Sequence, residues 1–150
     1  MLETRYEIGL DSSRARIAVI DDDTVFVDLM HDLLANGEGY EVVSSSQWVQ
    51  SYEFIKNSDP DLVILDLMMG RDQTGWAILQ LLQEDPATAR IPVILCSAAE
   101  PALRQKSWRL NDLATVEAVP KPFDVDQLLD VIARLLAQRS RKIAGQPKLS

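Results

Sequence analysis

Short apolar stretches alternate with longer amphipathic segments along this chain, and that alternation restricts the fold more than any other feature of the sequence. The apolar stretches are rich in leucine and β-branched residues, and their length is typical of strands. The predicted strands span residues 16–20, 41–43, 62–65, 93–96 and 116–119. Because these stretches contain few polar residues, we expect both faces of the sheet to be covered.

The segments between the strands carry apolar residues at helical spacing. In the first of them, Val25, Leu29 and Leu33 recur every fourth residue, and Asp23 or Thr24 is a suitable N-cap. The predicted helices span residues 24–36, 47–57, 75–84, 101–110 and 124–137. This alternating order predicts an α/β fold, a doubly wound five-stranded parallel sheet with helices on both faces.

Polar residues directly follow four of the predicted strands. Three consecutive aspartates, 21–23, follow the first strand, and Asp66, Ser97 and Lys121 follow the third, fourth and fifth. In open parallel sheets, ligands bind outside the carboxyl ends of the strands, where the strand order reverses. We therefore expect these residues to surround a ligand site.

The residue types at these strand ends suit phosphoryl transfer. Asp66 is expected to approach Asp21 and Asp22, and three crowded carboxylates repel one another unless a cation binds. Oxygen ligands completed by water suit Mg²⁺, whereas the spacing of a calcium-binding loop is absent. Ser97 adds a neutral donor and Lys121 a positive charge, as transfer of a phosphoryl group requires. Asp66 is then the carboxylate that accepts the group.

Each of these residues also has a simpler interpretation. The aspartates at 21–23 fit a solvated helix cap, Asp66 a turn before a helix, Ser97 a strand-end hydroxyl and Lys121 a surface lysine. For any one residue taken alone, that alternative stays open. The four positions together favour the phosphoryl-transfer site.

Composition limits the class of protein. A chain of 150 residues suffices for one domain with a buried core. The net charge of −8 is unlike that of most nucleic-acid-binding domains, and no long apolar span or signal peptide is recognisable. We therefore expect a cytoplasmic protein that contacts neither nucleic acid nor a membrane. Cys96 is the single cysteine, which excludes an internal disulfide and a zinc cluster of thiolates.

Four motifs at the predicted strand ends resemble those of the receiver domain of bacterial two-component response regulators. In chain order they read VIDDD, PDLVILDLMM, VILCSA and VPKPF. The resemblance covers about residues 15–137, which leaves an N-terminal extension at 1–14 and a basic C-terminal tail at 138–150. It implies a flavodoxin-like fold with the strand order 2-1-3-4-5.

The resemblance also implies a set of Mg²⁺ ligands. Asp21 and Asp22 correspond to the acidic pair of the family, and Asp22 is the one expected to contact the ion directly. Asp66 corresponds to the phosphorylated aspartate and is a metal ligand as well. The backbone carbonyl of Met68 corresponds to a further ligand.

Two more positions match the family, and two depart from it. Ser97 corresponds to the switch hydroxyl, and Lys121 to the phosphate-binding lysine, which a cis peptide bond joins to the next proline. Gly70 stands where the family usually has proline, which should loosen the loop after the phosphorylated aspartate. Ala118 replaces the aromatic residue that usually moves with the switch hydroxyl.

By this resemblance, the chain takes a phosphoryl group from a sensor histidine kinase or phosphotransfer protein in a Mg²⁺-dependent step and signals through protein contact. It would not be an enzyme beyond assisting its own phosphorylation and dephosphorylation. The departures favour an alternative, a pseudo-receiver that binds a partner without phosphorylation. A phosphatase is disfavoured because Met68 stands where its second acid would be. The kinase, the output partner and the oligomeric state, a homodimer included, stay open.

Overall fold

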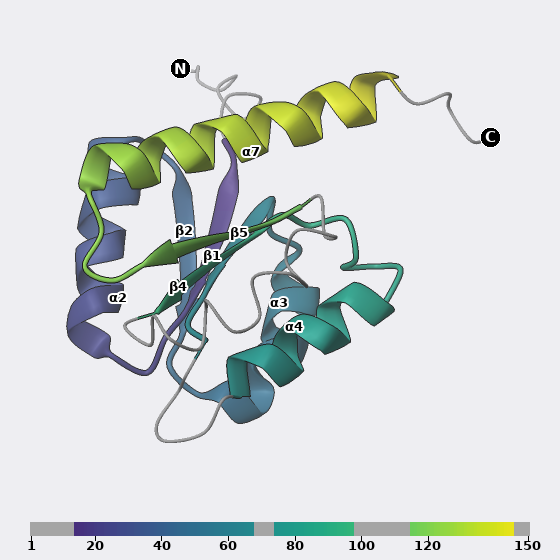
Figure 1. The fold of residues 1–150 in the computed structure, drawn as a ribbon, viewed down its shortest axis with the longest axis horizontal. Helices are drawn as coiled ribbons and strands as arrows, with labels where there is room; N and C mark the ends of the chain where they lie inside the picture. Colours follow the sequence, from purple (N-terminus) through teal and green to yellow (C-terminus); the bar gives the residue numbers. More distant parts are fainter. Residues whose placement is uncertain (1–13, 68–73, 98–114, 146–150) are drawn as a thin grey trace, which may run out of the picture.

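A computed structural model describes residues 14–67, 74–97 and 115–145 of the chain (Figure 1). Strands and helices alternate along these residues, as the sequence predicts. The strands are β1 (Arg16–Ile20), β2 (Glu41–Ser45), β3 (Leu62–Leu65), β4 (Val93–Ser97) and β5 (Val116–Pro120). The helical elements are α2 (Thr24–Met30), η1 (His31–Gly37), η2 (Trp48–Gln50), α3 (Ser51–Ser58), α4 (Thr74–Glu84) and α7 (Val125–Gly145).

The five strands form one sheet in the order β2-β1-β3-β4-β5, and every neighbouring pair is parallel. The predicted α/β class and the implied strand order are therefore confirmed. Helices α2 and α7 cover one face of the sheet, and α3 and α4 cover the other (Figure 1).

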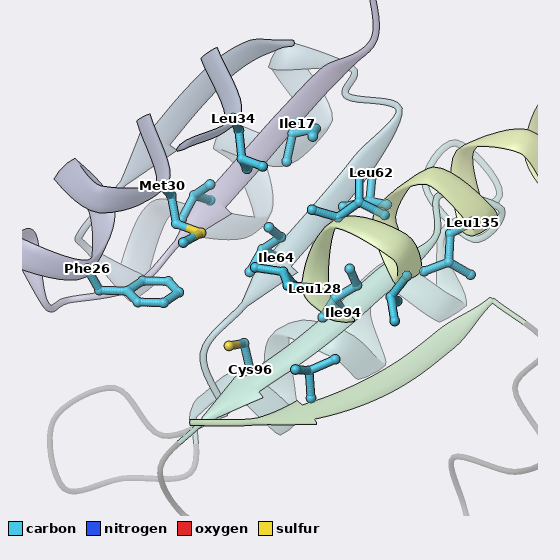
Figure 2. Packing of buried hydrophobic residues seen from close by; sticks show 14 residues of the cluster. Ile17, Phe26, Met30, Leu34, Leu62, Ile64, Ile94, Cys96, Leu128 and Leu135 are labelled. Carbon is cyan, nitrogen blue, oxygen red and sulfur yellow. The ribbon is translucent and has the colours of Figure 1, made fainter. Parts of the chain in front are cut away.

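Alternation along the strands divides the core into two clusters, since successive side chains point to opposite faces. Ala18 and Ile20 of β1 pack into the cluster beneath α3 and α4. Ile17 and Val19 pack into the other, beneath α2 and α7. Figure 2 shows Ile17 within this cluster. All four side chains are fully buried, which confirms that both faces of the sheet are covered.

The first helix differs in type from the prediction. It begins where expected, because the Asp23 carboxylate accepts hydrogen bonds from the backbone N–H groups of Val25 and Phe26 at 3.0 and 3.3 Å. After Met30 it continues as a π-helix, in which each N–H bonds one residue further back than in an α-helix. Hydrophobic spacing does not report which carbonyl an N–H chooses, so the pattern could not distinguish the two helix types.

The connection after this helix needs glycine. Gly39 has a φ of 80°, a left-handed conformation that favours glycine. Its N–H donates to the carbonyl of Ala35 at 3.1 Å, and the next N–H, of Tyr40, donates to that of Leu34 at 2.9 Å. The chain is thereby turned into edge strand β2.

Two other predicted helices differ from the structure, and a third is not tested by it. The one predicted at 47–57 begins as the 3₁₀ turn η2, and the one predicted at 101–110 lies outside the described residues. The last helix, predicted to end at residue 137, continues to Gly145. The side chain of Arg139 anchors this extension, because it donates to the carbonyl of Pro60 at 3.1 Å and lies 3.6 Å from the Asp61 carboxylate.

Within the described residues, no helix combines the length and the apolar character that crossing a membrane would require.

A polar cluster joins α3 to the end of α4. The Asp85 carboxylate accepts a short hydrogen bond from the Tyr52 hydroxyl and lies 3.1 Å from the Lys56 ammonium. It also accepts the backbone N–H of Ala87 at 2.9 Å. The Tyr52 hydroxyl, then the Ala87 N–H and then Lys56 stabilise the carboxylate, and they lower the pKa of Asp85 from 3.8 to about 2.

We predict that this cluster stabilises the fold in a pH-dependent way. Because the pKa of Asp85 is lowered by folding, its contribution is complete above pH 3.8 and is lost as the pH falls toward 2. Asp85→Asn should therefore lower the free energy of unfolding near neutral pH and flatten its dependence on pH between about 4 and 2. Urea unfolding at a series of pH values measures both effects.

Two further variants separate the contacts from the charge. Tyr52→Phe removes the hydroxyl that lowers the pKa of Asp85 most, so it should flatten the same pH range. Glu84→Gln is the control for charge, because it removes one negative charge from the neighbouring residue and leaves the Tyr52 and Lys56 contacts of Asp85 intact. It should keep the pH dependence that Asp85 causes. An unchanged pH dependence in Asp85→Asn would contradict the prediction.

Candidate functional site

The site lies at the carboxyl edge of the sheet, where the strand order reverses between β1 and β3. Ile20 and Leu65 are paired in register, so the residues that follow them, Asp21 and Asp66, leave the sheet side by side. The backbone N–H of Asp66 donates to the carbonyl of Ile20 at 2.9 Å. Parallel pairing thus brings together two carboxylates that are 45 positions apart (66 minus 21) in the chain.

Three carboxylates converge at this edge. One carboxylate oxygen from each of Asp21, Asp22 and Asp66 lies within 4.8 Å of the other two. Asp21 is 1% exposed and Asp66 is 7% exposed, whereas Asp22 faces solvent. Burial of Asp21 and Asp66 limits screening by water, so the repulsion among the three carboxylates has to be offset by positive charge nearby.

The third aspartate of the VIDDD motif has a different task. Asp23 caps α2 with its side chain, and it is not a member of the carboxylate cluster. Its backbone N–H donates to Oδ1 of Asp21 at 2.9 Å. This bond holds one oxygen of the buried Asp21 carboxylate and leaves Oδ2 to face β5.

Lys121 approaches the cluster from the end of β5. Its Nζ lies 2.6 Å from Oδ2 of Asp21, and its peptide bond to Pro122 is cis, as the family resemblance implies. Burial alone would lower the pKa of Lys121, but the hydrogen bond to Asp21 and the charges of Asp21 and Asp66 outweigh it. The pKa is therefore raised, and the ammonium stays charged.

One contact at this site was missed by the sequence analysis. Phe26, in the first turns of α2, lies with its ring centroid 4.0 Å from Nζ of Lys121. Phe26 is not singled out by the sequence analysis, and its ring also belongs to the core cluster beneath α2 and α7. An aromatic residue five positions after the first aspartate (26 minus 21) was the available signal, and it has meaning only once β5 is known to end nearby.

Two predicted site groups lie outside the part that the structure describes, namely Met68 and the side chain of Ser97. Gly70 lies outside it as well. The backbone of Ser97 is in register with Pro120, so this strand end lies beside that of Lys121. Next to it, burial raises the pKa of the Cys96 thiol to about 12, which makes that side chain an inert core residue.

The donor set fits a hard divalent cation. The cluster contributes three carboxylates, and among the described residues Lys121 contributes one positive charge beside them. The remaining negative charge, carried by oxygen ligands with one acid open to solvent, is the environment that Mg²⁺ prefers because it retains part of its water shell.

The chain is similar to known proteins in sequence and in fold. Residues 17–133 match the family described as "Response regulator receiver domain". The DNA-binding dual master transcriptional regulator RpaA of Synechocystis is 32% identical over 128 residues, which cover 84% of this chain and 51% of that protein. Chemotaxis protein CheY of Bacillus subtilis is 31% identical over 124 residues, 81% of this chain and 97% of CheY.

A solved structure agrees with these matches. The crystal structure of a CheY-like response regulator receiver domain protein from Methanospirillum hungatei superimposes with a TM-score of 0.75 and 25% sequence identity. The match covers 87% of this chain and 99% of that one. This chain spans about half of RpaA but nearly all of CheY.

We predict that Gly75 cannot be replaced without disturbing the backbone of the site. A Cβ atom there would lie 2.3 Å from the carbonyl oxygen of Asp66 and 2.6 Å from two backbone atoms of Leu67. Because backbone atoms cannot move aside as a side chain can, Gly75→Ala should lower the free energy of unfolding by about 1–3 kcal/mol. Urea unfolding measures the change.

Gly37→Ala is the matched control. A Cβ atom there would meet only the carbonyl oxygen of Asp32, at an ordinary 3.7 Å. Since its φ lies outside the left-handed region, alanine should leave stability unchanged or raise it by about 0.4–1 kcal/mol. Equal stability of the two variants would refute the close approach at Gly75.

Proposed function

The chain belongs to the response regulator receiver domain family, and from that premise we propose that it is a phosphoacceptor of a two-component signalling system. Asp66 takes a phosphoryl group from the phosphohistidine of a sensor histidine kinase or of a phosphotransfer protein. The receiver unit extends over residues 15–137. Its output passes through contact with another protein.

One observation carries this proposal, the gathering of Asp66, Asp21, Asp22 and Lys121 from three separate strand ends. Asp66 is nearly buried, and its carboxylate shares the cluster with two further acids. A solvated turn or a helix cap does not need such convergence, which has an electrostatic cost. A site that binds a cation and a phosphoryl group does need it.

Asp21, Asp22 and Asp66 would hold Mg²⁺, together with the backbone carbonyl of Met68. The bound ion supplies positive charge that offsets the negative charge of the transferred phosphoryl oxygens. Lys121 provides the second positive charge, held by Asp21 at the edge of the cluster. Ser97 provides a neutral hydroxyl donor from the neighbouring strand end.

The chemical step is a nucleophilic displacement at phosphorus. A carboxylate oxygen of Asp66 forms a bond to phosphorus while the bond from phosphorus to the imidazole nitrogen of the donor breaks. The imidazole leaves with that electron pair. The acyl-phosphate carries about −1.5 to −2 charges in place of the single charge of the Asp66 carboxylate, and the Lys121 ammonium, which lies beside Asp21, compensates part of that charge.

Phosphorylation then provides a signal by population shift. New contacts of the phosphoryl group with Lys121 and Ser97 favour one arrangement of the last two strand ends over another. Ala118 of β5 packs against the core cluster beneath α3 and α4. With a methyl group there in place of a ring, the shift has to be carried by the backbone and by neighbouring side chains.

Asp66→Asn tests the assignment directly. Incubation with a small acyl-phosphate and Mg²⁺ should add about 80 Da, the mass of one phosphoryl group, to the wild-type chain and nothing to the variant. Intact mass spectrometry measures the product. Hydroxylamine should remove the added mass, since it cleaves acyl-phosphates.

Asp59→Asn serves as a matched control, because Asp59 precedes the opposite end of β3. Its left-handed backbone, with a φ of 49°, tolerates asparagine. This variant should be phosphorylated like the wild type. If the wild-type chain itself takes no phosphoryl group, the chain is instead a pseudo-receiver that binds its partner without phosphorylation.

We predict a second, independent property, stabilisation by Mg²⁺. At a concentration about a hundred times its Kd, an ion that binds only the folded chain adds about 2.7 kcal/mol to the free energy of unfolding. Asp22→Asn should remove most of this gain, because it takes away the carboxylate that is expected to contact the ion directly. Asp22 is exposed, so the substitution leaves the buried core unchanged. Thermal unfolding with and without Mg²⁺ measures it.

Asp23→Asn controls for the loss of one negative charge. Asparagine caps helices as well as aspartate does, so this variant should keep both its helix and its response to Mg²⁺. Equal loss of the response in both variants would mean that general charge attracts the ion, and that the three-carboxylate cluster does not bind it.

A further inference from the structure

The Lys121 ammonium contacts a second group besides Asp21. Its Nζ lies 4.0 Å from the centroid of the Phe26 ring and 2.6 Å from Oδ2 of Asp21. The lysine side chain is 18% exposed, so most of its water shell has been replaced by these neighbours. The ring and the carboxylate together define where the positive charge lies.

The Phe26 ring is itself held in place. It is 8% exposed and belongs to the core cluster beneath α2 and α7 (Figure 2). The Phe123 ring packs edge-on against it, with centroids 5.9 Å apart and an interplanar angle of 86°. At the backbone, the N–H of Phe26 donates to the capping carboxylate of Asp23. Packing on these sides restricts the positions that the ring can take.

An aromatic ring acts on an ammonium in a way that an aliphatic side chain does not. Its face carries partial negative charge and attracts a cation within about 6 Å, most strongly where water is excluded. A leucine would fill similar space without this attraction. A third carboxylate beside Lys121 would attract it too, but its full charge would repel an incoming phosphoryl group. The ring face stabilises the ammonium without adding that charge.

We propose that Phe26 is a positioning residue for phosphoryl transfer, whose ring face holds the Lys121 ammonium beside Asp21 and ready for the phosphoryl group on Asp66. This inference rests on the proposed function of Asp66. It adds a component from the first turns of α2, which the motifs at the strand ends do not contain.

The contact itself can be measured without any phosphorylation. Protons that lie over an aromatic face are shifted upfield in the NMR spectrum by the ring current. The ε-methylene protons of Lys121, assigned with a Lys121→Met variant, should therefore resonate upfield of those of the other lysines. Phe26→Leu should abolish the shift, and Phe26→Tyr, which keeps the ring face, should retain it.

The effect on transfer is measured with a small acyl-phosphate and Mg²⁺ on the full chain. Phe26→Leu should lower the maximal rate of phosphorylation about three- to tenfold, the range that loss of a partly desolvated cation–π contact implies. Phe26→Tyr should restore it. Met30→Leu is the matched control, since Met30 lies one turn further along in the same cluster and is fully buried. It should keep the wild-type rate.

The outcomes separate the two proposals. Absence of the upfield shift in the wild-type chain overturns the contact. A normal rate in Phe26→Leu, or a loss as large in Met30→Leu, overturns the positioning role. If the wild-type chain is not phosphorylated at all, the proposed function of Asp66 fails, and the ring-current shift alone decides whether Phe26 holds the ammonium.

Discussion

Parallel pairing of the five strands places the ends of distant chain segments at one edge of the sheet. When all strands run in one direction, every carboxyl end lies at the same edge of the sheet. Residues that follow β1, β3 and β5 therefore gather there, although Asp21 and Lys121 are 100 positions apart. The sheet itself is buried on two faces, one beneath α2 and α7 and one beneath α3 and α4. The parallel sheet is therefore what brings these site residues together.

The positive and negative charges of the described residues at this edge do not balance, and negative charge remains. Asp21 is almost fully buried, and a buried carboxylate is tolerated only when it is paired and hydrogen-bonded. Lys121 and the N–H of Asp23 supply those partners. Asp22 and Asp66 bring further negative charge to the same place. This arrangement fits the proposed function, in which the retained negative charge would bind a divalent cation and the ammonium would face a phosphoryl oxygen.

Much of this could be predicted from the sequence because it depends on local patterns. Leucine and β-branched residues identified all five strands, and Asp23 was correctly predicted as one of two N-cap candidates. The predictions were less accurate where the decisive partner is distant in the chain. The extension of α7 depends on Arg139 reaching Pro60, and the π-helix after Met30 depends on a choice between carbonyls. The spacing of hydrophobic residues indicates neither of these features.

The order of strands and helices, the burial of both faces of the sheet and the polar residues after its strands can all be read from the sequence alone. Periodicity and residue type are enough for these, since they reflect interactions over a few residues. Three features become known only from the folded structure: which oxygen of Asp21 contacts Lys121, that Asp22 and not Asp23 joins the carboxylate cluster, and that the Phe26 ring lies against the ammonium. These contacts depend on distances between separate elements, which are set when the whole sheet and its helices pack together.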